Sequence, residues 1–158
     1  MKKENRPAES IAQQLAEQSI RAELEKEVGF ILRKERFLLG DGRELEVDAA
    51  NKDKLFFAEI CTRLGKLQPA HLEKVASDIL KLLFIERTLD VQCNKALCFA
   101  NATWKTYFQG RSWIAAAAAS YDVRIVVVGL PEEILLQIFA GTRSPIRCPD
   151  IAIALSTR

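Results

Sequence analysis

A short run of branched apolar residues near the C-terminus constrains the fold of this chain more than any other feature. Residues 123–128 are Val-Arg-Ile-Val-Val-Val, bounded by Asp122 and Gly129. β-Branched residues favour strands, and so apolar a run predicts a strand that is buried on both faces. An alanine run at residues 115–119 precedes it and predicts a helix with Ser112 as its N-cap. We therefore expect an α/β fold with helices around a small central sheet.

Hydrophobic spacing elsewhere in the chain predicts helices more often than strands. Apolar residues recur at helical intervals in four further segments. We expect these helices over residues 8–28, 53–64, 69–83 and 90–106. Alternating apolar runs on either side of Gly40-Asp41-Gly42 predict a β-hairpin. Residues 131–139 fit either a helix or a strand, and residues 151–155 predict a final strand.

Length, composition and charge limit the classes of protein to which the chain can belong. It has 158 residues, of which 49% are apolar, enough for one domain with a substantial core. Its 23 basic and 21 acidic residues nearly cancel, which gives no support for a nucleic-acid partner. No run reaches the ~18–20 apolar residues of a membrane-spanning helix, and the charged N-terminus is unlike a secretory signal. We expect a cytoplasmic protein without nucleic-acid or membrane partners.

The cysteines and the single histidine do not form a metal-binding pattern. Cys93 and Cys98 are five residues apart, whereas zinc sites use closer spacing and further ligands. Cys61 and Cys148 lie far from them in sequence, and the histidine, His71, is on another segment. We therefore expect reduced, mostly buried thiols and no metal or other cofactor.

The segment Lys-Leu-Phe-Phe-Ala-Glu-Ile at residues 54–60 and the stretch 106–128 together resemble the ovarian-tumour (OTU) class of cysteine proteases, which remove ubiquitin. Residues 54–60 are similar to the end of the pattern Asp-Gly-Asn-Cys-Leu-Phe-x-Ala. Residues 106–128 are similar to Trp-Gly-Gly-x-x-Glu-Leu-x-Ala-Leu-Ala and the buried strand that follows it. The resemblance covers roughly residues 46–155. It implies an OTU-like cysteine-protease fold in residues 30–158, with residues 1–29 as an N-terminal amphipathic helical extension.

The residues that would carry OTU chemistry are absent from the matching positions. Lys54 stands at the nucleophile position, Asn51 at that of the first aspartate, and Ile151 at that of the histidine. A second alignment, over residues 41–45, also lacks a cysteine. The resemblance therefore implies a catalytically inactive pseudo-protease.

Three functional hypotheses follow from the sequence. The first is a pseudo-protease that binds ubiquitin, a ubiquitin-like protein or another protein. Its binding cleft would contain Lys54, Phe108, Gln109, Gly110 and Arg111. The second is an interaction module without a ubiquitin connection, which forms homo-oligomers or docks on a larger partner through helix 8–28. The third is an active deubiquitinase with a rearranged site, for which Cys61 and His71 are the nearest cysteine and histidine in sequence.

Overall fold

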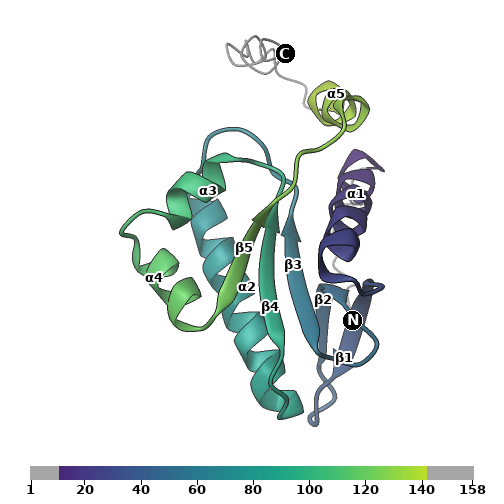
Figure 1. Ribbon diagram of the computed structural model, residues 1–158, viewed down its shortest axis with the longest axis vertical. Helices are drawn as coiled ribbons and strands as arrows, with labels where there is room; N and C mark the ends of the chain where they lie inside the picture. Colours follow the sequence, from purple (N-terminus) through teal and green to yellow (C-terminus); the bar gives the residue numbers. More distant parts are fainter. Residues whose placement is uncertain (1–10, 142–158) are drawn as a thin grey trace, which may run out of the picture.

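The computed structural model describes residues 11–141, which form a five-stranded mixed sheet and five helices (Figure 1). The strands lie in the sheet in their order along the chain. They are β1 (Arg33–Leu38), β2 (Glu44–Ala50), β3 (Phe56–Cys61), β4 (Asn94–Phe99) and β5 (Val123–Val127). The first three are antiparallel neighbours, whereas β3, β4 and β5 are parallel. The strand expected at residues 151–155, with Ile151, lies outside the described residues.

The helices cover the sheet on both faces, as Figure 1 shows. Helix α1 (Ile11–Val28) lies on one face. Helices α2 (Pro69–Leu89), α3 (Thr103–Phe108) and α4 (Trp113–Ser120) lie on the other, because they form the crossovers that parallel strands require. Helix α5 (Glu132–Gly141) follows β5 and contacts α1. None of the helices within residues 11–141 is both long and apolar enough to span a bilayer.

Each face of the sheet has its own apolar core. On the α1 face, Ile20 and Leu24 are fully buried against Phe56 and Ile60 of β3. On the α2 face, Trp104 stacks on Phe99 with 4.6 Å between ring centroids. The core there also contains Val47, Phe57, Val75, Ile79, Leu82, Ile85, Leu97 and Ile114. The sequence left open whether helix 8–28 packs on its own domain, and in the structure its apolar stripe does so.

The helix expected over residues 53–64 is wrong, because residues 56–61 form strand β3. All six residues of β3 are buried, since the strand lies in the middle of the sheet and helices cover both faces. A strand of this kind gives an apolar run without alternation. The four-residue spacing of Phe56 and Ile60 therefore coincided with a helical period. The helix expected over 90–106 is wrong for the same reason, since residues 94–99 form the neighbouring strand β4.

Other expected elements are confirmed where local signals specified them. The hairpin, the helices near residues 8–28, 69–83 and 113–120, and the strand at 123–127 are all present. The ambiguous segment 131–139 is helical. The expected burial of both faces of the 123–128 strand is only partly correct. Among the described strands β5 pairs with β4 alone, and Arg124 is exposed.

Asn51 holds the turn between β2 and β3, and replacing it with alanine should destabilise the fold. Its side chain is 2% exposed, and its Oδ1 accepts hydrogen bonds from the N–H groups of Leu55 and Phe56, each at 2.9 Å. Asn51→Ala leaves these two donors without that acceptor, so we expect the free energy of unfolding to fall by about 1–3 kcal/mol. Urea denaturation measures the change. Asn94→Ala, at an exposed strand start, is the matched control, and equal losses in both variants would contradict this role.

Candidate functional site

Three carboxylates and two lysines gather between the sheet and α2. Asp48 comes from β2, Glu59 from β3, and Lys74, Asp78 and Lys81 from α2. We call this group the carboxylate–lysine cluster. Charged side chains are rarely buried unless they are paired or functional, so a group of this kind inside an apolar layer needs an explanation.

The cluster forms where strands β2 and β3 stop pairing. The two strands pair at Ala49–Ala58 and Ala50–Phe57, and the ladder ends there. Beyond that point the N–H of Ile60 donates to Oδ2 of Asp48 at 2.9 Å, so a side-chain carboxylate takes the place of a backbone acceptor. Asp48 and Glu59 thereby come close together although eleven positions separate them in sequence.

Glu59 is the most unusual member of the cluster, because it is only 2% exposed. Its Oε2 accepts from Nζ of Lys81 at 2.6 Å, and the same ammonium donates to the carbonyl of Glu46 at 3.1 Å. Its Oε1 has no hydrogen-bond partner in the described part of the chain. Burial, together with the nearby charge of Asp48, raises the pKa of Glu59 to about 8, and Lys81 opposes this shift. A buried oxygen of this type normally has a partner.

The remaining charges surround this pair. Asp78 is 6% exposed and accepts from Nζ of Lys74 at 2.7 Å, while burial raises the pKa of the Asp78 carboxyl. Lys34 of β1 lies on the other side of Asp48, with 3.9 Å between Nζ and Oδ1. Lys34 also contacts Glu46 at 3.3 Å. Asp48 therefore has a cation nearby on the β1 side.

This geometry gives little support to the hypothesis of a rearranged active site with Cys61 and His71. Cys61 lies two residues after Glu59 in β3, and burial raises the pKa of its thiol, which keeps the sulfur protonated. Nδ1 of His71 accepts from the N–H of Gln68 at the start of α2, at 3.2 Å. Each group is thus held in a structural role.

The structure separates the residues of the binding cleft expected from sequence. Lys54 precedes β3, has a φ of 59°, pairs with Glu35 and lies over the Phe37 ring. The stretch 108–111 begins at the last residue of α3, a helix that comes after the C-terminal end of β4. Because β3 and β4 are parallel, these positions are at opposite ends of the sheet. Asn51 is a buried turn residue, as described above.

Sequence reasoning missed the cluster, although one signal was present. Glu59 is a single acidic residue inside the apolar run Phe-Phe-Ala-Glu-Ile-Cys. Once that run is recognised as a buried strand, its carboxylate must face a partner or a ligand. The contributions of Lys74 and Lys81 depend on the packing of α2, which the local sequence does not specify.

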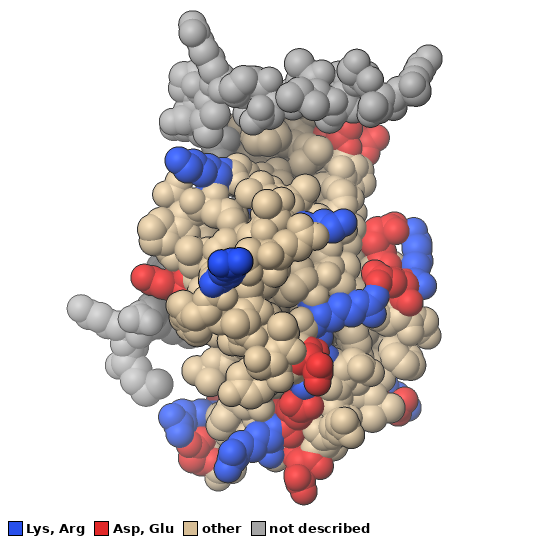
Figure 2. Space-filling model, turned by 60° about the vertical axis from the view of Figure 1, so that its left-hand side comes forward, with Lys and Arg blue, Asp and Glu red and all other residues tan. Residues whose placement is uncertain are grey.

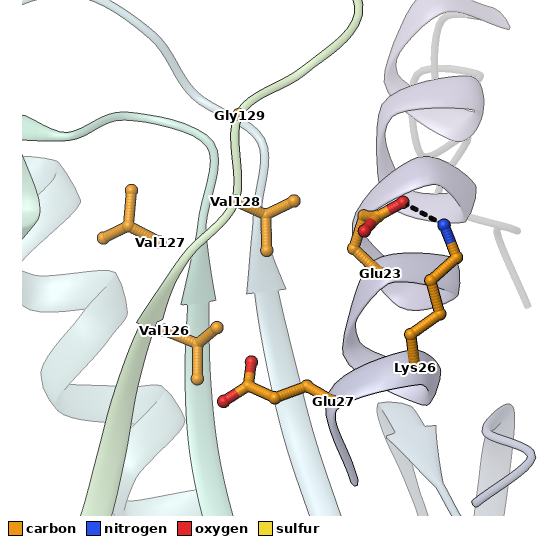
Figure 3. Close-up of a pocket in the computed structure, with 7 residues that line it drawn as sticks. All are labelled: Glu23, Lys26, Glu27, Val126, Val127, Val128 and Gly129. Atoms are coloured by element: carbon orange, nitrogen blue, oxygen red, sulfur yellow. Dashed lines mark hydrogen bonds and ion pairs between the residues drawn. The ribbon is translucent and has the colours of Figure 1, made fainter. Parts of the chain in front are cut away.

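A hollow of about 500 Å³ also lies between the C-terminal half of α1 and β5 (Figure 3). Glu23 and Lys26 on its α1 side pair with each other at 2.6 Å, and Glu27 pairs with Arg124. The apolar part comes from Val126 and its neighbours in β5. The charges around this hollow therefore already have partners, unlike Oε1 of Glu59.

The carboxylates of the cluster are hard oxygen donors, the ligand type that Mg²⁺ prefers. Within residues 11–141 no group of three or more His, Cys, Asp or Glu side chains is placed to hold a metal ion. Mg²⁺ commonly binds through one or two carboxylates and keeps several waters. Asp48 and Glu59 supply two carboxylates, and Oε1 of Glu59 has no partner within the described residues. No protein-family model, curated protein or solved structure matches the chain, so the cluster has to be interpreted from its own geometry.

Proposed function

We propose that Asp48 and Glu59 bind a divalent cation of the Mg²⁺ type, and that the domain hydrolyses phosphodiester bonds with the help of Lys81. The observation that carries this proposal is the buried, unpartnered Oε1 of Glu59 beside a second carboxylate. Leaving such an oxygen without a partner costs about 1–3 kcal/mol or more. A bound cation offsets this cost and favours the ionised form of Glu59.

The lysines favour an anionic substrate. Lys81 is held by both Glu59 and the carbonyl of Glu46, so its ammonium has a defined position before any substrate binds. Lys74 is nearby and its side chain is half exposed. A preorganised cation stabilises negative charge that develops in a transition state. Two lysines beside a cation-binding carboxylate pair therefore suit a phosphate ester.

The reaction is a simple displacement by water. The oxygen of a water molecule attacks phosphorus and gives up a proton, the bond from phosphorus to the leaving ester oxygen breaks, and the leaving oxygen takes up a proton in return. When bound, a divalent cation lowers the pKa of a coordinated water and withdraws charge from phosphate oxygens. Lys81 stabilises the charge that develops on those oxygens. Glu59 and Asp48 supply the negative charge that retains the cation.

Cation binding tests the first part of the proposal. At pH 8, Mn²⁺ or Mg²⁺ at a hundred times its dissociation constant should stabilise the fold by about 3 kcal/mol, which raises the melting temperature by roughly 5–10 °C. The rise should be smaller at pH 6, because a proton competes for Glu59. Differential scanning fluorimetry measures it, and Glu59→Gln should remove it. An equal rise in the wild type and Glu59→Gln would contradict this site.

The ubiquitin hypothesis remains a second proposal. Its support is the order of the second motif, because helix α4 is followed directly by strand β5, as the OTU resemblance implies. The first motif does not contain the helix that the resemblance implies, since residues 56–61 form a strand. Titration of isotopically labelled ubiquitin with the full chain tests it by NMR. Chemical-shift changes that saturate below millimolar concentration would favour it, and their absence would remove it.

Self-association through helix 8–28 also remains a proposal. The apolar residues Ala16, Ile20 and Leu24 of α1 are buried in the chain's own core. Any contact between copies would therefore use the charged outer face, which includes Glu23 and Lys26. Light scattering of the full chain at increasing salt concentration tests this idea.

A further inference from the structure

The surface of α3 and the beginning of α4 differs in charge from the rest of the molecule. No Asp or Glu occurs between Asp90 and Asp122, a stretch that includes both helices. Lys105 and Arg111 are exposed there, and neither forms an ion pair with a carboxylate within residues 11–141. Figure 2 brings this side forward and shows isolated basic groups on a largely uncharged surface. The chain as a whole is nearly neutral, although this surface carries an excess of positive charge.

A hollow of about 380 Å³ opens on this surface between α3 and β5. Phe108, Ile125 and Val127 supply its apolar lining, and Lys105 and Gln109 supply an ammonium and a carboxamide. The volume is in the range of small-ligand sites, which combine apolar walls with a few polar groups. A flat heterocycle can pack on this lining while the carboxamide donates to and accepts from its polar edge.

An exposed tryptophan lies just beyond the hollow in sequence. Trp113 begins α4 and is 71% exposed, although a large aromatic side chain is usually buried. Ser112 caps the helix, with its Oγ accepting from the N–H of Ala115 at 3.1 Å, so the backbone that carries the indole is fixed. An exposed indole on a fixed backbone, two residues after the exposed Arg111, is a platform on which a nucleic-acid base can stack.

We propose that α3, the turn after it and the first residue of α4 bind single-stranded nucleic acid. One base enters the hollow beside Gln109, another stacks on Trp113, and Lys105 and Arg111 contact the phosphates. A single strand is favoured over a duplex because its base faces are free. This inference rests on the proposed function, since it names the polymer whose phosphodiester bonds the carboxylate–lysine cluster would cleave.

The test measures binding without hydrolysis. The full chain is titrated into fluorescein-labelled dT20 in EDTA at 50 mM salt, and anisotropy reports the complex. Lys105→Glu with Arg111→Glu should weaken binding at least about ten-fold. The matched control, Lys52→Glu with Arg87→Glu, makes the same change in net charge at exposed positions elsewhere and should change affinity less than about two-fold.

The aromatic contact has its own variant and readout. Trp113→Ala should weaken dT20 binding about five- to hundred-fold, whereas Tyr121→Ala, an exposed aromatic at the other end of α4, should leave it unchanged. Because Trp104 is buried, quenching of tryptophan fluorescence by unlabelled dT20 reports mainly on Trp113.

Several outcomes would overturn the inference. These are no binding of dT20 at 50 mM salt, equal losses in the control pair, or equal losses in Trp113→Ala and Tyr121→Ala. Stronger retention on anionic lipid vesicles than on dT20, with the same sensitivity to the charge reversals, would also overturn it and assign the surface to membranes. Hydrolysis of a small diester, bis(p-nitrophenyl) phosphate, separately tests the cluster, so the two proposals can fail independently.

Discussion

Replacing Asp48 with asparagine is expected to lower metal-dependent phosphodiester hydrolysis about 10²–10³-fold. The change removes one of the two negative charges that hold the cation and position it for the reaction. It keeps the shape of the side chain and an oxygen that can accept from the N–H of Ile60, a bond of 2.9 Å in the wild type. The variant should therefore fold normally and lose activity through the loss of charge alone.

Initial rates with bis(p-nitrophenyl) phosphate and with a labelled oligonucleotide, each over a range of Mn²⁺ concentrations, measure this loss. Asp53→Asn is the matched control, because it removes a carboxylate from an exposed turn residue near the same strands and should leave the rates unchanged. Activity that persists in Asp48→Asn, or that does not require a divalent cation in the wild type, would contradict the proposed mechanism.

The parts of the fold that could be predicted from the sequence were those with local signals. The glycine turn specifies the β1–β2 hairpin, a capping serine and an alanine run specify α4, and the helical apolar spacing specifies α1. Strands β3 and β4 were missed because both faces of each are covered, so neither shows the alternation that identifies a strand. In such a segment the spacing of apolar residues cannot distinguish helix from strand.

The candidate site depends on contacts that local sequence does not contain. Asp48 and Glu59 become neighbours only through the β2–β3 pairing, and Lys81 reaches Glu59 only because α2 packs over that pair of strands. The helix mistakenly expected at residues 53–64 gave Glu59 no partner and no role. Once the segment is a central strand, the same residue becomes a buried acid with one free oxygen.

The same buried acid should make stability depend on pH in a direction that Glu59→Gln abolishes. The pKa of Glu59 is about 8 in the folded chain and close to 4.5 when exposed. Between these values the unfolded chain releases the proton while the folded chain retains it, so stability falls as pH rises from about 4.5 to 8. The stability lost over this range is at most about 5 kcal/mol. Below pH 4.5 both states are protonated and the contribution is complete.

Urea denaturation of the wild type and Glu59→Gln at several pH values measures this dependence. Relative to the wild type, the variant should gain stability steadily between pH 4.5 and 8 and show a constant difference above that range. Glutamine keeps an oxygen that can accept from Nζ of Lys81, and titrating groups that do not interact with Glu59 cancel in the comparison. Glu44→Gln, at an exposed start of β2, should show no such trend. Saturating Mn²⁺ should restore the wild type at pH 8 and have little effect on Glu59→Gln, because Asp48 is then the one carboxylate of the pair that is left. A stability difference that stays the same from pH 5 to 8 would show that the Glu59 carboxyl ionises as it does in water, and the cluster would then lack the buried acid on which cation binding depends.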